Sequence, residues 1–221
     1  MIKNNKLKSI ISSAVILLPI LIGLLLWNKL PDKIATHWGA NGQANGWSSK
    51  PFAVFALPLF VFAIHWLCLF FTSKDPKNKG QSKKVSGLIF WICPAVSLFA
   101  GVLTYTIALG KELNASSAAL VLIGLMYIIL GNYMPKCKQN YTIGIKIQWT
   151  LDNEENWNAT HRMAGKLWMI CGLLFAACLL LPEKILVWAF LSIVTVSVVV
   201  PMVYSYHHYK KHRKLSSDDD I

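Results

Sequence analysis

Histidine and carboxylate side chains are the groups in this sequence best suited to acid–base chemistry. Thr160-His161-Arg162 follows Glu154 and Glu155, and together these residues offer a nucleophile, a base and a phosphate clamp. A helix whose histidine is hydrogen-bonded in a packed interface explains the same residues without catalysis. We favour the packed helix, because no second cluster of reactive side chains accompanies it, and we expect no enzymatic activity.

Two further histidines have different surroundings. Asp32 and His37 are the only acid–base groups in a segment rich in Gly, Asn and Trp, which favours binding over catalysis. His65 lies within a long apolar run, where a polar side chain is a functional candidate by default. No acidic residue lies in any apolar run, so the sequence argues against a proton-relay transporter.

The cysteines indicate neither a disulfide nor a metal site. Four of them are within apolar runs, namely Cys68, Cys93, Cys171 and Cys178. Cys137 lies in a Lys-rich segment, and no pair has the spacing of metal ligands. All five are predicted to be small buried side chains, and we expect no metal and no cofactor.

Long apolar runs are the elements that must position these residues. The chain is 55% hydrophobic and only 14% charged, which does not fit a soluble domain. Six runs approach the length of a membrane span, at residues 10–27, 52–72, 85–109, 117–133, 167–181 and 185–204. The predicted fold class is all-α, a polytopic membrane helix bundle with six transmembrane helices. The fifth run is short, so we expect it to take a turn from the segment before Lys166.

The distribution of positive charge predicts the orientation. One side of the predicted membrane carries 17 of the 22 Lys and Arg residues and the other side carries 5, so the richer side, with both termini, is cytoplasmic. A topology lacking the fourth or fifth span would separate the termini and weaken this bias. Because the charge of +12 follows from topology, we expect a multi-pass protein of the cell membrane, in contact with the lipid bilayer and binding no nucleic acid.

The runs divide the chain into segments. They are a two-helix unit at 1–73 with an outside loop at 28–51, a basic linker at 74–84, a four-helix unit at 85–206 with a cytoplasmic loop at 132–166, and a cytoplasmic tail at 207–221. The tail contains His207, His208 and His212, followed by Asp218 to Asp220. It is predicted to be a solvated end, because no residue is placed to complete a metal site.

The outside loop combines turn-forming and aromatic residues. Its Gly and Asn residues allow tight turns with positive φ, which fold the segment back over the membrane. Trp38 and Trp47 would anchor it at the lipid interface. Together with Asp32, His37 and Gly46 they also form a candidate surface for recognition outside the cell.

The cytoplasmic loop has its own pattern. Residues 141–149 alternate like an extended segment, and Asp152 with Glu155 is typical of a cap ahead of a helix at 154–166. Four residues of that helix share one face: Trp157, Thr160, His161 and Ala164. We expect this face to lie against the bilayer or the helix bundle.

Both loops resemble known patterns. Leu30-Pro31, Thr36-His37-Trp38 and Gly46-Trp47 are similar to a small N-terminal domain of undefined function that is often fused to the SdpI family. The cytoplasmic loop resembles the SdpI signature itself at Asn132, Tyr133, Pro135, Asn140, Gly144, Lys146, Trp149, Trp157, Thr160, His161 and Arg162. It departs from the pattern at Gln139, Lys146 and Gln148, where Pro, Arg and Pro are commoner.

The resemblance implies an immunity protein that protects a Gram-positive producer or its neighbours from a secreted, membrane-active antimicrobial peptide toxin. It also implies a possible receptor role, in which the cytoplasmic loop holds an autorepressor, a transcription factor, at the membrane. A transporter of small solutes or lipids, and a membrane enzyme using His161 with Glu154 or Glu155, are the alternatives.

Overall fold

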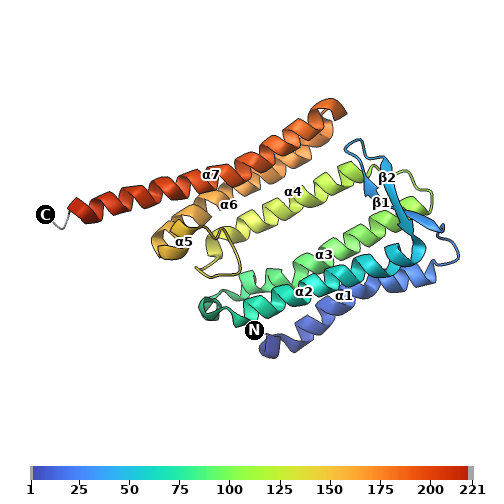
Figure 1. Cartoon of the computed structure of the whole chain (residues 1–221), viewed down its shortest axis with the longest axis horizontal. Coiled ribbons are helices and arrows are strands. Elements are labelled where there is room, and N and C mark those ends of the chain that lie inside the picture. The colour runs from blue at the N-terminus through green and yellow to red at the C-terminus, as the bar shows by residue number, and fades with distance from the viewer. Residues whose placement is uncertain (1, 219–221) are drawn as a thin grey trace. The chain divides into compact units, whose positions relative to one another are not determined.

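Six helices of the computed structural model are long and apolar enough to cross a membrane (Figure 1). The model describes the backbone of residues 2–218, and their side chains except at residues 3, 4, 79 and 212–218. Within that range the six spans are α1 (Lys6–Leu25), η2 with α2 (Phe52–Ala56, Leu57–Lys74), α3 (Lys83–Ala108), α4 with η4 (Ala115–Tyr133, Met134–Lys136), α6 with η5 (Glu154–Ala177, Cys178–Leu180) and α7 (Glu183–Asp218).

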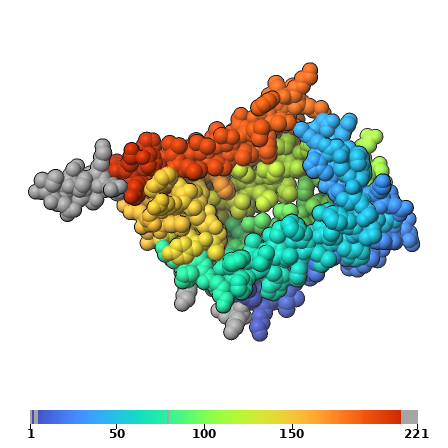
Figure 2. Space-filling model, viewed as in Figure 1, coloured from blue at the N-terminus to red at the C-terminus, as the bar shows by residue number. Residues whose placement is uncertain are grey.

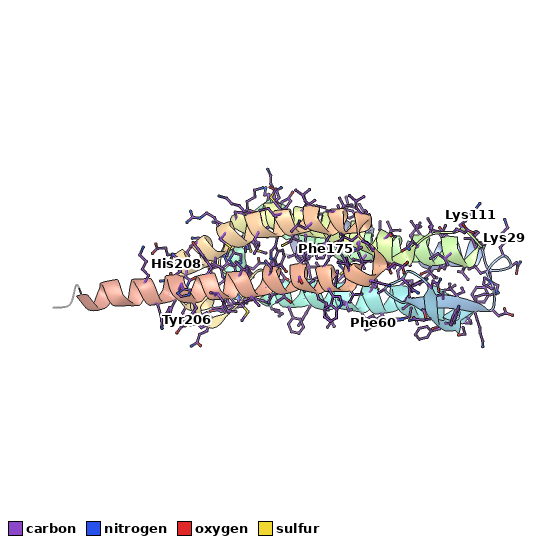
Figure 3. All side chains as sticks on the ribbon, turned by 90° about the horizontal axis from the view of Figure 1, so that it is seen from above. Lys29, Phe60, Lys111, Phe175, Tyr206 and His208 are labelled. Atoms are coloured by element: carbon purple, nitrogen blue, oxygen red, sulfur yellow. The ribbon has the colours of Figure 1, made fainter. Side chains whose placement is uncertain are left out.

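Large apolar side chains are exposed on the outer faces of these helices. The mean hydropathy of the six spans lies between 1.8 and 2.4. Large side chains such as Phe60 on α2, which is 65% exposed, point away from the packed core (Figure 3). Surfaces of this kind are stable against lipid and not against water. The chain is therefore a multi-pass membrane protein, and the six predicted spans are confirmed.

The chain forms two compact units. Unit 1 comprises the residues up to Lys74 together with Ser86–Ala119, and unit 2 comprises Asp75–Val85 together with the residues from Leu120 onward. This grouping differs from the division by sequence segments, because most of α3 packs with α1. The Ser97 hydroxyl donates to the carbonyl of Ile16 at 2.8 Å.

A β-hairpin connects α1 to η2 in unit 1. Strands β1 (Lys33–Trp38) and β2 (Ala44–Ser49) pair antiparallel, with Ile34 opposite Ser48. Gly42 supplies the positive φ, +74°, that the connecting turn needs. The sequence predicted turns here but no strands, because irregular pairing between Ala35 and Trp38 breaks the alternation of buried and exposed residues.

Three further contacts hold the unit 1 helices together. Tyr105 on α3 donates its hydroxyl proton to the carbonyl of Pro19 on α1 at 2.9 Å. Gly101 faces Pro19 so closely that a Cβ at Gly101 would lie 2.7 Å from the proline Cβ. His65 on α2 is fully buried, and its Nε2 lies 2.9 Å from the hydroxyl of Ser12.

Helices α4 and α6 make the closest packing in unit 2. Gly131 faces Gly165 and Gly124 faces Gly172, and a Cβ on any of the four would lie within 2.8 Å of a backbone oxygen on the other helix. Close backbone approach between small residues is how membrane helices gain packing energy without a hydrophobic driving force. Phe175, which Figure 3 labels, fills the space between this pair and α7.

Helix α7 is longer than predicted. Its apolar run ends near Tyr204, yet the helix continues to Asp218 through the segment expected to be a solvated tail. That segment contains no Gly or Pro and several good helix formers, so loss of hydrophobicity does not end the helix. The part of the predicted tail at residues 219–221 lies outside the described residues.

Candidate functional site

Four of the five residues proposed for recognition outside the cell lie on the hairpin of unit 1, and the fifth directly precedes it. Figure 2 shows it in light blue at the surface, and Lys29 and Lys111 in Figure 3 mark the end of unit 1 to which it belongs. His37 and Trp38 lie on β1, Gly46 and Trp47 lie on β2, and Asp32 directly precedes β1. The structure therefore brings these residues onto one element.

The hairpin is fixed at its base. Leu30 and Ile34 are buried against Val54 and Tyr105, which lie on η2 and α3. Lys50, which follows β2, forms an ion pair with Asp32 at 3.2 Å and donates to the carbonyl of Trp27, two residues beyond α1. Asp32 thus has a structural partner, although its side chain is exposed.

The hairpin is also held at its tip. The Ser116 hydroxyl at the start of α4 donates to the carbonyl of Gly39 at 2.8 Å, and Gly42 lies against the side chain of Asn114. Between base and tip, His37 and Asn45 pair across the strands through Nδ1 and Oδ1. Trp47 is 59% exposed, Trp38 is half-buried, and a Cβ at Gly46 would lie 2.9 Å from the Cβ of His37.

In unit 2 the cytoplasmic loop is built around five residues that we call the loop core: Cys137, Asn140, Gly144, Trp157 and His161. Trp157 and His161 stack with ring centroids 4.0 Å apart, and the Trp157 indole N–H donates to the carbonyl of Cys137. Gly144 has a φ of +107° and lies directly against the His161 ring. The shared face predicted for the following helix is confirmed as buried within unit 2.

Asn140 organises the backbone of this loop. Its amide N–H groups donate to the carbonyls of Lys138 and Ile143, and its Oδ1 accepts from the backbone N–H groups of Thr142 and Ile143. The loop backbone is therefore ordered by side chains. The extended segment predicted at residues 141–149 is wrong, since no strand forms there and the short helix α5 (Gln148–Asp152) begins before its end.

His161 has both ring nitrogens engaged. The backbone N–H of Ile145 donates to Nε2 at 3.0 Å, so Nδ1 carries the proton and donates to the carbonyl of Trp157 at 2.8 Å. The ring is 1% exposed, whereas Glu154 and Glu155 are exposed. This arrangement is that of a structural histidine joining loop to helix, which favours the packed-helix interpretation of Thr160-His161-Arg162.

The start of α6 differs from the prediction in its cap and adds a polar contact with α7. The cap of α6 is Asn153 and not Asp152, because the Asn153 side chain accepts from the backbone N–H of Asn156 at 2.7 Å. Thr160 donates to Asn156 Oδ1, and Asn156 in turn donates to the carbonyl of Ser205 on α7. This buried polar pairing joins α6 to α7.

Sequence reasoning missed Asp75, which is 7% exposed. Its side chain caps the short turn η3 (Pro76–Gly80). The same carboxylate accepts hydrogen bonds from two groups of the cytoplasmic loop, the backbone N–H of Tyr141 and the hydroxyl of Thr142. The dipeptide Asp75-Pro76 is a typical helix start, but the partners lie 66 and 67 residues away. Gln81 makes a similar link to Lys138, and Gln139 donates to the carbonyls of Thr150 and Leu151.

The remaining cytoplasmic candidates lie nearer the surface. Lys146 and Arg162 are exposed, and Lys146 donates to the carbonyl of Thr142. Asn132 accepts from Lys136, which lies over the ring of Tyr133, and Pro135 packs on Gly165. Trp149 is half-buried against Tyr206 on α7, which Figure 3 labels beside His208. Within the described residues no three His, Cys, Asp or Glu side chains are grouped as metal ligands.

The comparisons with known proteins match both loops. Residues 136–205 match the SdpI/YfhL protein family, and residues 14–62 match a domain of unknown function, DUF1648. The chain is 29% identical over 207 residues to the immunity protein SdpI of Bacillus subtilis (strain 168), an alignment that covers 92% of this chain and 97% of the relative. No solved structure matches the chain.

Each of the two family matches contains one of the two structured loops. The DUF1648 match includes β1 and β2 of the hairpin, and the SdpI match includes all five residues of the loop core. The near full-length alignment with an immunity protein joins the two regions in one polypeptide. The chain therefore matches the SdpI/YfhL protein family over residues 136–205, has a DUF1648 region in front of that match, and is similar over nearly its full length to an immunity protein.

Proposed function

We propose that this protein protects the cell that carries it by binding a secreted, membrane-active antimicrobial peptide at the hairpin of unit 1. The similarity to an immunity protein supports a protective role and does not identify the target. The observation that carries the choice of site is the hairpin itself, which is fixed at base and tip and still exposes Trp47. A rigid aromatic surface binds with little loss of conformational entropy.

The proposal requires the hairpin to face the outside of the cell. The asymmetry of 17 against 5 positive residues supports that orientation, with both termini in the cytoplasm. A peptide arriving from outside then meets the hairpin before it reaches the lipid. Capture at this point keeps the peptide from inserting elsewhere in the membrane.

A second role is proposed for the cytoplasmic loop of unit 2. Its loop core is held by side-chain hydrogen bonds, and exposed Lys146 and Arg162 with half-buried Trp149 give the loop a basic surface with an aromatic side chain. We propose that this surface holds a cytoplasmic autorepressor once the toxin is bound. Such a receptor needs a toxin-dependent difference in the surface offered to the repressor.

The geometry favours binding over the alternative functions. An enzyme using His161 would need a free ring nitrogen, and both nitrogens are occupied by backbone partners. A transporter would need polar groups around a cavity in the middle of the membrane. His65 is the one histidine inside a predicted span, and its Nε2 is taken up by Ser12.

The test is survival of a sensitive Gram-positive host exposed to the antimicrobial peptides secreted by Bacillus subtilis strain 168, the source of the relative. We expect the wild-type chain to protect and the double variant His37→Ala/Trp47→Ala to lose at least about tenfold in tolerated peptide concentration, the effect of about 1.4 kcal/mol in binding. The matched control is Trp188→Ala, which removes a 70% exposed tryptophan from α7.

Membrane levels of all variants are measured by immunoblot. Loss of protection in the hairpin variant at wild-type membrane levels supports the proposal. Full protection by the hairpin variant would remove the hairpin as the binding site, and equal losses in the hairpin and Trp188 variants would indicate a nonspecific effect of removing tryptophan.

A further inference from the structure

Helix α3 has one end in each of the two buried clusters that carry the proposed sites. Val85, in its first turn, is buried with Cys137 and Trp157 of the loop core. Tyr105, in its last turn, belongs to the buried cluster at the base of the hairpin. We call this the base cluster, and it consists of Leu30, Ile34, Ala53, Val54 and Tyr105. The 20 positions from Val85 to Tyr105 form one helix and span about 30 Å at 1.5 Å per residue.

The second span reaches the same two places from its own ends. Val54 in η2 is fully buried in the base cluster, and the helix continues without a break to Lys74 at the end of α2. The next residue is Asp75, which accepts hydrogen bonds from Tyr141 and Thr142 of the cytoplasmic loop. Each of these two spans therefore has the hairpin base at one end and the cytoplasmic loop at the other.

The chain between the two spans is docked on the cytoplasmic loop. We call residues 75–85 the docked segment, which belongs to unit 2 although the residues on both sides of it belong to unit 1. The side chain of Gln81 accepts from the backbone N–H of Lys138 at 3.1 Å and donates to the carbonyl of the same residue at 3.2 Å. Its amide nitrogen also lies 3.5 Å from Cys137 Sγ. Apart from Val85, the contacts named here are polar, and segments with few buried apolar contacts open locally at low cost.

These connections restrict how the two ends of each span can move. Coupling over 20–40 Å is carried by rigid secondary structure elements that end in a part with two arrangements. A shift of α2 or α3 that starts at the base cluster reaches the docked segment, which is the more weakly held of the two ends. The loop itself remains ordered when this segment leaves, because Asn140 bonds the loop backbone at Lys138, Thr142 and Ile143.

We propose that the docked segment is the coupling element of the receptor. It covers the loop beside Cys137 in the toxin-free protein and detaches when the toxin displaces the base cluster. Asp75 and Gln81 are positioning residues, because they act on the loop and contact neither toxin nor repressor. This inference rests on the proposed function and supplies the toxin-dependent difference in surface that a receptor needs.

The thiol of Cys137 reports on this event, because the Gln81 amide lies against it and the residue is only 4% exposed. The rate of its modification by maleimide at pH 7.5 is measured on the full chain in isolated membranes, with the other four cysteines replaced by alanine. We expect Asp75→Ala to raise this rate at least about tenfold through loss of hydrogen bonds to a buried carboxylate. The matched control is Asp152→Ala, which removes an exposed aspartate of the same loop and is expected to leave the rate unchanged.

The coupling is tested from the hairpin end of the spans. Ile34→Ala loosens the base cluster, whereas Ile16→Ala removes the same group from a fully buried position of α1 outside that cluster. We expect Ile34→Ala to raise the Cys137 rate at least about threefold and Ile16→Ala to leave it unchanged. In the Asp75→Ala background, Ile34→Ala is expected to add nothing, because the docked segment is already detached.

Two results would overturn the coupling. An unchanged Cys137 rate in Asp75→Ala would show that the docked segment does not cover the thiol. Equal rates in the two isoleucine variants would show that general loosening of the fold, and not the base cluster, controls the loop.

The secreted peptides of Bacillus subtilis strain 168 separate this inference from the proposed function. A rise in the Cys137 rate when peptide is added, absent in the Asp75→Ala background, supports both. If the chain protects cells and peptide leaves the Cys137 rate unchanged, protection stands and the coupling is wrong. If the Asp75 and Ile34 variants behave as expected and the chain gives no protection, the coupling is a property of the fold and the proposed function is wrong.

Discussion

Gly144 is the residue whose substitution tests the loop core most directly. Its φ of +107° disfavours any side chain, and a Cβ there would collide with the His161 ring. Gly110 is the matched control, because it also has a positive φ, +82°, but open space where a Cβ would lie. We expect Gly144→Ala to lower the free energy of unfolding by about 1–3 kcal/mol more than Gly110→Ala, since it also breaks the Ile145–His161 hydrogen bond.

The measurement is thermal unfolding of the purified proteins in detergent. Equal losses for the two variants would mean that backbone strain alone accounts for the effect, and that the contact between Gly144 and His161 contributes nothing to stability.

Cys137 provides a prediction about pH at the same scale. Burial raises the pKa of its thiol to about 11, although side-chain N–H groups of Asn140 and Gln81 lower it in part. Because the folded pKa lies above that of the unfolded thiol, this contribution to stability is complete at neutral pH and is lost as the pH rises toward 11. We expect maleimide to leave Cys137 unmodified at pH 7.5 in the native protein and to modify it after denaturation, as peptide mass spectrometry can measure. Rapid native modification would contradict the burial of this thiol.

At the scale of elements, the packing of α4 against α6 depends on glycine. A Cβ at Gly165 would lie 2.7 Å from the carbonyl oxygen of Gly131, and backbone atoms in a helix cannot move aside easily. We expect Gly165→Ala to destabilise unit 2 by about 1–3 kcal/mol through overpacking. Gly87→Ala on α3, with nothing within 4 Å, is expected to be neutral or slightly stabilising. Unfolding by SDS titration measures both, and comparable stability of the two variants would show that the helices can separate at no cost.

The prediction for the whole molecule concerns its orientation in the membrane. In a variant whose five native cysteines are replaced by alanine, single cysteines are introduced by Ser49→Cys in the hairpin, Asp152→Cys in the cytoplasmic loop and Lys211→Cys on α7, all at exposed positions. We expect a membrane-impermeant maleimide to label only the hairpin cysteine in intact cells, and the other two after permeabilisation. Labelling of Lys211→Cys in intact cells would place the C-terminus outside and exclude the proposed orientation.

The sequence predicts the spans of this molecule much better than the contacts of its loops. Lipid demands long apolar helices, so the six runs are visible in composition alone. The shared face of Trp157, Thr160, His161 and Ala164 is also visible, because helical periodicity is local. Asp75 could not be assigned its role, since its partners are set by folding across more than 60 residues.

The hairpin shows a different limit of sequence reasoning. Ile34 and Ala35 are neighbours and both are buried, so β1 lacks the alternation by which a half-buried strand is recognised. The cap predicted for α6, Asp152, lies one residue before the observed cap, Asn153. Both residue types are good caps, and only the backbone geometry selects Asn153.

The loop of unit 2 has one further consequence, for the time scale of its motion. Five backbone N–H groups of this loop donate to side chains. That of Tyr141 donates to Asp75, and those of Thr142 and Ile143 donate to Asn140. That of Ile145 donates to His161, and that of Ile147 donates to Thr150. Each must open before its hydrogen can exchange with solvent, so this irregular segment should exchange as slowly as a helix. A cytoplasmic partner therefore meets a loop whose backbone is already ordered, and association requires no disorder-to-order transition of this segment.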